Sequence, residues 1–134
     1  MATSMLSSRP TSWNLPENNG SMLKIYHNPR CAKSREGLNY LIEHGLAYEV
    51  VQYLDHPLSV EDLKRILMKL NLKAFQVIRT QEEIYRKELK GKKFTDGEWI
   101  SIILQHPRLL QRPVVEGKYK AVIARPAERI NDVI

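Results

Sequence analysis

The residue best suited to do chemistry in this sequence is Cys31, the single cysteine of the 134-residue chain. It lies in the stretch Tyr26-His27-Asn28-Pro29-Arg30-Cys31-Ala32-Lys33-Ser34-Arg35, which is polar and basic around the sulfur. Only the thiolate form of cysteine is a good nucleophile, and positive potential around the sulfur stabilises that form. A lone cysteine is more often a buried, inert side chain. The surroundings of Cys31 favour a reactive thiolate instead.

Three kinds of group are expected to lower the pKa of Cys31. It follows a turn between a strand and a helix, where free backbone N–H groups and the helix dipole favour an anion. Upstream, His27 can donate a hydrogen bond or a charge, and downstream the hydroxyl of Ser34 can reach the sulfur from the first helical turn. Basic side chains flank the cysteine in sequence at Arg30, Lys33 and Arg35.

Arginine occurs at the ends of three predicted elements. Arg79 ends the apolar stretch Ala74-Phe75-Gln76-Val77-Ile78, whereas Arg112 and Arg125 each precede a proline. An arginine at the end of an element is usually only solvated. An oxyanion, however, is best bound by several planar guanidinium groups that converge on it. These arginines are therefore candidate oxyanion ligands, and sequence spacing leaves open whether they converge.

A metal site is the alternative use of this region, because His27 and Cys31 are both possible ligands. We predict no metal site, since the chain has no second cysteine and its other histidines are scattered. One cysteine also excludes an intramolecular disulfide, so a reducing, cytoplasmic location is expected. No apolar run approaches the roughly 18 residues of a membrane span, so no membrane association is expected.

The net charge of +6 suits an anionic ligand or an acidic partner. The most basic run, residues 86–93, has no interleaved aromatic residues to stack on bases, so nucleic-acid binding is not expected. Residues 1–21 are rich in Ser, Asn and Pro and lack periodicity, which predicts a disordered leader or a remnant of cloning. Residues 22–134 are expected to form one domain.

The hydrophobic pattern predicts the elements that must hold these residues. Residues 23–26 and 48–53 favour short β-strands. Between them, Leu38, Leu41 and Ile42 mark the inner face of a helix that ends near Gly45.

The middle of the chain is predicted to be helical. Ser59 with Asp62 and Thr95 with Glu98 resemble capping boxes, each of which would begin a helix. The inner faces of these two helices would carry Leu63, Ile66, Leu67 and Leu70 in the first, and Trp99, Ile102 and Ile103 in the second. Residues 73–90 are predicted to form a further helical stretch between them.

The end of the chain predicts two strands, residues 111–115 and 119–123, and a last helix from Pro126. The order of elements is β-α-β, three helical segments, then β-β-α. This order predicts an α/β domain in which a small mixed sheet is flanked by helices, with a helical insertion between strands 2 and 3.

The motifs together resemble those of the glutaredoxin-linked arsenate reductases, the ArsC-like family. The resemblance covers essentially all of residues 22–134. The matching segments are Ile25-Tyr26-His27-Asn28-Pro29-Arg30-Cys31, Ser34-Arg35, Gln105-His106-Pro107, Gln111-Arg112-Pro113-Val114-Val115 and Arg125-Pro126-Ala127-Glu128. The resemblance implies a thioredoxin-like fold with a four-stranded mixed sheet. It also implies that Pro113 is the cis proline that this fold places beside the cysteine.

The same resemblance implies roles for the site residues. Cys31 would attack arsenate, and Arg79, Arg112 and Arg125 would bind the oxyanion. His27 and Ser34 would lower the pKa of the thiol, and Arg35 would support the loop. Glutathione would then attack the Cys31–arsenate adduct and glutaredoxin would reduce the mixed species, so that arsenite leaves. The protein would act as a monomer with glutathione as co-substrate and without a bound cofactor.

The sequence departs from this family at Ala32-Lys33, where arsenate reductases usually have Gly-Thr. Loss of the glycine limits how closely the backbone approaches an oxyanion. A general glutathione-dependent thiol oxidoreductase of the same family is therefore the alternative. A regulator that binds RNA polymerase, like the related Spx proteins, is disfavoured, because Ser34 replaces the second cysteine of their disulfide switch.

Overall fold

The computed structural model describes residues 22–134, and the predicted leader at residues 1–21 lies outside this range. Four short strands form one mixed sheet in the order β2-β1-β3-β4. Their bounds are β1 Leu23–Tyr26, β2 Tyr48–Val51, β3 Val114–Glu116 and β4 Ala121–Ile123. β1 pairs parallel with β2 and antiparallel with β3, which pairs antiparallel with β4. The predicted four-stranded mixed sheet is confirmed.

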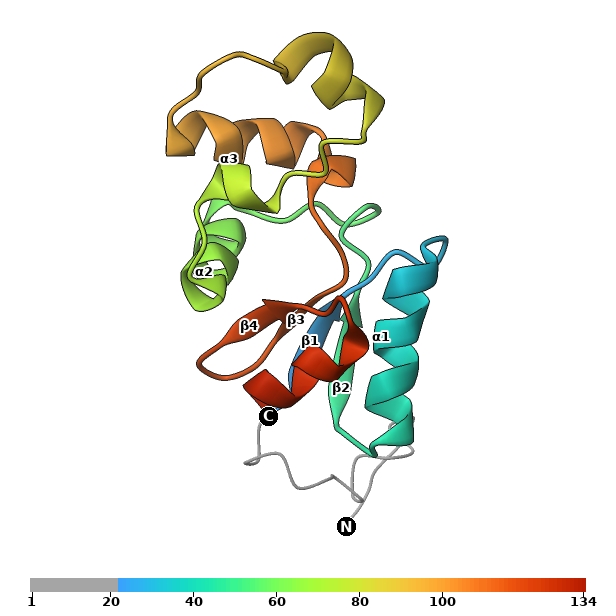
Figure 1. Cartoon of the computed structure of the whole chain (residues 1–134). Coiled ribbons are helices and arrows are strands. Elements are labelled where there is room, and N and C mark those ends of the chain that lie inside the picture. The colour runs from blue at the N-terminus through green and yellow to red at the C-terminus, as the bar shows by residue number, and fades with distance from the viewer. Residues whose placement is uncertain (1–21) are drawn as a thin grey trace.

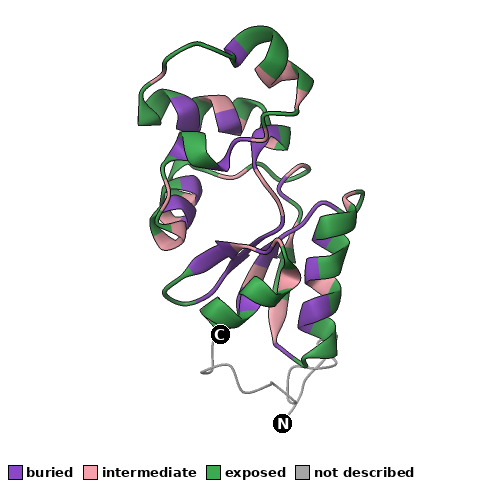
Figure 2. Cartoon of the chain, in the orientation of Figure 1, coloured by how far each residue is buried: buried purple, intermediate pink, exposed green. Residues whose placement is uncertain are grey.

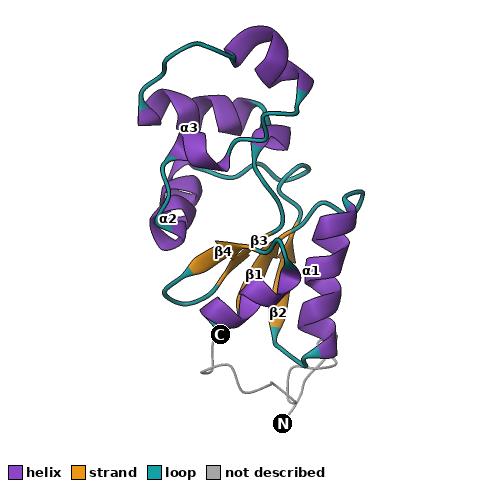
Figure 3. Ribbon diagram, in the orientation of Figure 1, coloured by secondary structure: helices purple, strands orange, loops and turns teal. Residues whose placement is uncertain are grey.

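Helices cover the two faces of this sheet (Figures 1 and 3). α1 (Ala32–Glu43) and a C-terminal 3₁₀ helix (Ala127–Val133) pack together on one face. The helical insertion between β2 and β3 carries α2 (Val60–Leu70) and α3 (Asp96–Gln105), and α2 contacts β4. No helix that the structure describes combines the length and apolar character of a bilayer-spanning segment.

Two separate groups of buried side chains hold these layers together, and the buried segments of the strands and helices face one another in Figure 2. The smaller core lies under α1 and includes Ile25, Leu41 and Ile130. The larger core joins the sheet to the insertion and includes Tyr53, Ile66 and Ile103. Because side chains alternate along a strand, each strand contributes to both cores.

The predicted helix starts are confirmed. Ser59 and Thr95 each accept a hydrogen bond from the backbone three residues later, and the side chains of Asp62 and Glu98 bond back to complete both capping boxes. One inward-facing assignment is wrong, because Ile42 is 53% exposed. The buried stripe of α1 instead runs through Gly37, Tyr40 and Leu41.

The continuous helical stretch predicted for residues 73–90 is also wrong. The structure has a short 3₁₀ helix at Ala74–Val77, an isolated antiparallel bridge between Ile78 and Leu110, and a π-helical turn at Tyr85–Leu89. The extended backbone at Ile78 interrupts the helix, because it pairs with the chain that leads into β3.

A buried charge network ties α2 to the sheet. Glu116 is only 4% exposed and its carboxylate accepts hydrogen bonds from Arg65 Nε and Lys69 Nζ, both at 2.7 Å. The hydroxyl of Tyr26 donates to the same carboxylate at 2.6 Å. These bonds hold the pKa of Glu116 at about 2 despite burial, which alone would raise it. The network therefore fixes a charged carboxylate between insertion and sheet.

Candidate active site

Cys31 lies where the turn after β1 enters α1, and it is the N-cap residue of that helix. Its backbone N–H donates to the carbonyl of Asn28 at 3.0 Å, and the N–H of Arg30 donates to the Asn28 side chain at 3.0 Å. Asn28 therefore holds the loop with both its carbonyl and its side chain, a role that was not predicted from the sequence. The sulfur is partly exposed at the rim of this loop.

Local hydrogen-bond donors hold the pKa of Cys31 below its ordinary value. Burial acts in the opposite direction and raises the pKa. The backbone N–H groups of Ser34 and Lys33 and the guanidinium of Arg112 outweigh it, because each stabilises the thiolate. The expectation that free N–H groups at the helix start would favour an anion agrees with this geometry.

The side chains of Ser34 and His27 do not act in the way the sequence analysis expected. Ser34 is fully buried, and its hydroxyl lies 2.7 Å from His27 Nδ1 and accepts from the N–H of Asn28 at 2.9 Å. Ser34 therefore reaches the sulfur through its backbone, while its hydroxyl ties the loop to β1. Burial lowers the pKa of His27, and the charge of Arg35 acts in the same direction. A neutral His27 orders the loop but supplies no positive charge.

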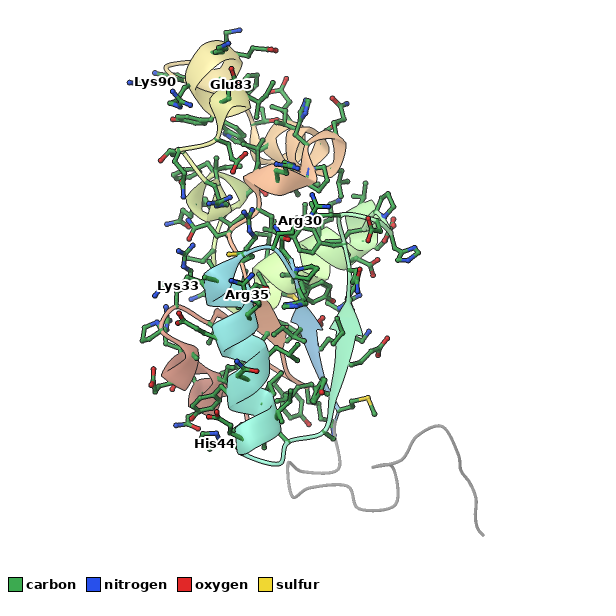
Figure 4. The ribbon with its side chains drawn as sticks, turned by 90° about the vertical axis from the view of Figure 1, so that its right-hand side faces the viewer. Arg30, Lys33, Arg35, His44, Glu83 and Lys90 are labelled. Atoms are coloured by element: carbon green, nitrogen blue, oxygen red, sulfur yellow. The ribbon has the colours of Figure 1, made fainter. Side chains whose placement is uncertain are left out.

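Two of the basic side chains close to Cys31 in sequence, Lys33 and Arg35, bind other groups. Lys33 pairs with Glu36 at 3.6 Å, and both side chains are more than half exposed. Arg35 Nη1 donates to the carbonyl of Pro29 at 2.9 Å, so this side chain links α1 to the loop. Figure 4 shows Lys33 and Arg35 beside the first turn of α1 and His44 at the other end of the helix.

The register of the sheet brings Arg112 and Arg125 to the loop of Cys31. Tyr26 pairs with Val114, and Val114 pairs with Ile123. If both ladders are continued by two residues, Arg112 lies between the turn after β1 and Arg125. A hydrogen bond from the Ala124 N–H to the Pro113 carbonyl, at 2.8 Å, extends the ladder between β3 and β4. Two arginines far apart in sequence thus meet at one edge of the sheet.

Arg79 reaches the same place from the insertion. Its N–H donates to the Leu109 carbonyl at 2.7 Å, so the end of its segment lies against the chain that leads to Arg112. Burial lowers the pKa of Arg79, and the nearby positive charges of Arg112 and Arg125 lower it further, whereas Glu82 and the Cys31 thiolate raise it. Arg79 therefore lies close enough to Arg112, Arg125 and Cys31 to interact with all of them. Glu82, 2.6 Å from Arg79 Nη1, was not predicted.

Tyr53 is a further member of the cluster that sequence analysis assigned only to a strand. Its side chain is 1% exposed, and Arg112, Arg79 and Cys31 all act electrostatically on its hydroxyl. The sequence offers one signal for this role of Tyr53. The residue comes just after β2, at the carboxyl end of a parallel strand pair, and ligands commonly bind at such ends.

Pro113 follows Arg112 directly and contacts α1. The Arg112–Pro113 peptide bond is cis, as is Arg125–Pro126. A methyl group added at Gly37 of α1 would come within 2.8 Å of the Pro113 ring, so the absence of a side chain at Gly37 lets the helix approach this segment. The helix that begins at Cys31 is therefore seated directly on the proline.

A cleft of about 920 Å³ opens next to this cluster. Its lining combines basic and acidic side chains from the loop and the insertion, including Arg30, Arg108, Arg112, Asp55 and Glu82. Within residues 22–134, no three His, Cys, Asp or Glu side chains are grouped so that they could hold a metal ion. The arrangement suits a nucleophilic thiolate acting on a small anion, with open space beside it for a second, larger reactant.

Comparison with known proteins gives consistent relatives. The model of the ArsC family matches residues 26–133. An arsenate reductase of Neisseria meningitidis is 40% identical over 114 residues, covering 84% of this chain and 97% of that protein. The uncharacterized protein YfgD of Escherichia coli is 38% identical over 114 residues, covering 84% of this chain and 96% of that protein. The structure of an arsenate reductase from Vibrio cholerae has a TM-score of 0.81 at 36% identity, covering 87% of this chain and all of that one. These likenesses confirm the thioredoxin-like fold.

Proposed function

Because the chain belongs to the ArsC family, we propose that it is an arsenate reductase that depends on glutathione and glutaredoxin. The observation that carries the proposal is that Arg79 interacts electrostatically with Arg112, Arg125 and Cys31, whose pKa is lowered. Three guanidinium groups offset the charge of a divalent oxyanion, and a thiolate provides the nucleophile. Relatives called arsenate reductases support the choice of anion.

In the first step, the Cys31 thiolate attacks the arsenic of bound arsenate. A sulfur–arsenic bond forms and one arsenic–oxygen bond breaks, and the departing oxygen takes up protons and leaves as water. The arginines would stabilise the charge on the remaining oxygens throughout, which is how fixed donors lower the barrier of such substitutions.

The later steps need external thiols, because the chain has only one cysteine. Glutathione adds a second sulfur to arsenic and displaces a second water. A glutaredoxin thiolate then attacks the glutathione sulfur, so that a disulfide forms and the electron pair of the broken sulfur–arsenic bond remains on arsenic. Arsenic is thereby reduced from the +5 to the +3 state, and water displaces Cys31 to release arsenite. The cleft beside Arg112 offers room for glutathione. No bound cofactor is needed.

The test is arsenate-dependent oxidation of NADPH in the presence of glutathione, glutaredoxin and glutathione reductase. Cys31→Ser abolishes turnover. Each of the three Arg→Ala variants loses roughly 1.5–3 kcal/mol of transition-state stabilisation, the scale of a hydrogen bond between charged groups. Arg→Lys variants recover part of this loss, because lysine restores the charge but not the planar fork.

The alternative, a general thiol oxidoreductase, is favoured by Ala32-Lys33, since a side chain at residue 32 restricts approach to the loop. It predicts a different pattern in the same assay. If the arginine variants match the wild type while Cys31→Ser is inactive, the arginines do not bind substrate. A disulfide or a glutathione adduct is then the substrate, and arsenate is not.

A further inference from the structure

The buried polar atoms without a hydrogen-bond partner are concentrated at one place. Within residues 22–134 they are the hydroxyl of Tyr53 and the Nε atoms of Arg79 and Arg112. All three side chains interact electrostatically with Cys31. A buried polar group that lacks a partner lowers the stability of the fold, so such groups are rare unless a ligand satisfies them.

Tyr53 lies in the turn that follows β2, at the same end of the strands as Arg112 and Arg125. Tyr26 pairs with Val51 in the parallel ladder, and continuing this ladder by two residues places Tyr53 opposite Asn28. Continuing the two antiparallel ladders in the same way places Asn28 near Arg112, and Arg112 near Arg125. The loop of Cys31 therefore has an arginine pair on one side and Tyr53 on the other.

A second buried tyrosine provides the contrast. Tyr26 is 2% exposed and its hydroxyl donates to Glu116 at 2.6 Å and accepts from Arg65 at 3.2 Å, so its hydrogen-bonding capacity is used within the fold. The ring of Tyr53 is as deeply buried, in the core shared with Ile103 and Leu110. Its hydroxyl faces the guanidinium of Arg112 but completes no hydrogen bond of normal geometry. Packing accounts for the ring of Tyr53 and leaves the hydroxyl unexplained.

We propose that the Tyr53 hydroxyl binds the substrate, donating a hydrogen bond to an oxygen of the tetrahedral oxyanion that Arg79 and Arg112 hold beside Cys31. This inference rests on the proposed function. Burial raises the pKa of Tyr53, so the hydroxyl keeps its proton and acts as a neutral donor. It adds a directional bond without adding charge, and it orients one oxygen while the thiolate approaches arsenic from the side of α1.

The experiment compares Tyr53→Phe with Tyr26→Phe, which each remove one buried hydroxyl. Inorganic phosphate is the probe, because it has the shape of arsenate and is not reduced by thiols. We measure the phosphate concentration that half-protects Cys31 from a bulky iodoacetamide derivative, the KM for arsenate in the coupled assay, and stability in urea without ligand.

For Tyr53→Phe, the half-protecting phosphate concentration and the KM for arsenate both rise roughly tenfold, the effect of losing one hydrogen bond to a charged group. Its stability without ligand is unchanged or higher, since an unpaired polar group has been removed. Tyr26→Phe shows the reverse, with phosphate protection unchanged and stability reduced.

Three outcomes overturn the inference and can be told apart. If phosphate protects the wild type and Arg112→Ala loses protection, but Tyr53→Phe keeps it, the oxyanion site is real and Tyr53 is not part of it. If phosphate and arsenate fail to protect the wild type, the proposed function itself fails and the inference fails with it. A loss of stability in Tyr53→Phe without any change in protection would assign the hydroxyl to the fold alone.

Discussion

Cys31 receives its stabilisation from two sources that differ in their distance along the chain. The backbone N–H groups of Lys33 and Ser34 belong to its own helix, whereas the guanidinium of Arg112 arrives through the pairing of β1 with β3. The first source exists wherever a helix begins at a cysteine. The contribution of Arg112 requires β1 and β3 to be paired, so it depends on the tertiary structure.

This division predicts the pH dependence of alkylation. Because the pKa of Cys31 is lowered, its reaction with iodoacetamide stays fast at mildly acidic pH, where an ordinary cysteine is protonated. Arg112→Ala removes a stabilising charge from the thiolate, so the midpoint of the rate profile moves to higher pH. The measurement is the alkylation rate across a pH series.

Lys33→Ala is the matched control for Arg112→Ala. It removes a cation next to Cys31 in sequence but leaves the N–H of residue 33 in place, so the profile moves less than in Arg112→Ala. Equal shifts in the two variants would mean that nearby charge, rather than the placement of Arg112, sets the pKa. His27→Ala also moves the profile to higher pH, because the loop loses the contact between His27 and Ser34.

The identity of the site residues could be predicted from sequence, but several of their contacts could not. Cys31 and the three arginines were recognised by residue type and local setting. The directions of the Ser34 hydroxyl and the Lys33 side chain depend on which groups compete for them, and Asn28 and Glu36 compete successfully. For Tyr53 the one signal in the sequence is its position just after β2, and its neighbours Arg79 and Arg112 come from distant segments of the chain.

At the scale of elements, α1 is seated on the segment that carries Arg112. A side chain at Gly37 would meet the Pro113 ring at 2.8 Å, which is closer than real contacts allow. Small changes at this contact should therefore move the start of β3 relative to the helix of Cys31. The precision of the site depends on a residue that has no side chain.

Gly37→Ala tests this contact. We expect it to destabilise the protein by about 1–3 kcal/mol, as is typical when a packed interior receives an extra methyl group. It should also slow alkylation of Cys31 at mildly acidic pH, since Arg112 is displaced with Pro113. Urea unfolding and the alkylation profile measure the two effects.

Gly97→Ala is the control, because nothing lies within 4 Å of a methyl group added at Gly97 in α3. It should stabilise the helix slightly, by up to about 1 kcal/mol, since alanine favours helix more than glycine does. A loss of stability in both variants would point to a general effect of the substitution rather than to the contact with Pro113.

Local sequence predicted most elements because their signals are local. The two capping boxes needed only the residues of one turn, and they are confirmed at Ser59 and Thr95. The stretch 73–90 was read as helix because its composition suits a helix. Its backbone instead pairs at Ile78 with Leu110, a long-range contact that no local pattern reveals.

Across the whole molecule, the Glu116 network joins the insertion to the sheet. The side chain of Glu116 is buried between Arg65 and Lys69 of α2, and its pKa of about 2 lies below the ordinary value of 4.5. The native state therefore holds the ionised form more tightly than the unfolded chain does. This contribution to stability is fully present above about pH 4.5 and is lost as the pH falls toward 2.

Glu116→Gln should therefore be much less stable than the wild type at neutral pH, by about 3–5 kcal/mol, because two cations lose their buried partner. The difference should shrink as the pH falls from 4.5 toward 2, where the wild-type carboxylate also becomes neutral. Urea unfolding at pH 7, 5 and 3 measures it. Glu36→Gln, which breaks an exposed pair worth about 0–1 kcal/mol, is the control. A difference that does not depend on pH would contradict the assignment.

The dispersal of the site along the chain has a consequence for synthesis. Cys31 leaves the ribosome long before Arg112 and Arg125, and β1 gains β3 as a neighbour only after the entire insertion has been made. A nascent chain can form α1 and its local N–H donors, but it lacks the guanidinium of Arg112 beside the thiol. The full reactivity of Cys31 is therefore reached only when the last two strands have docked.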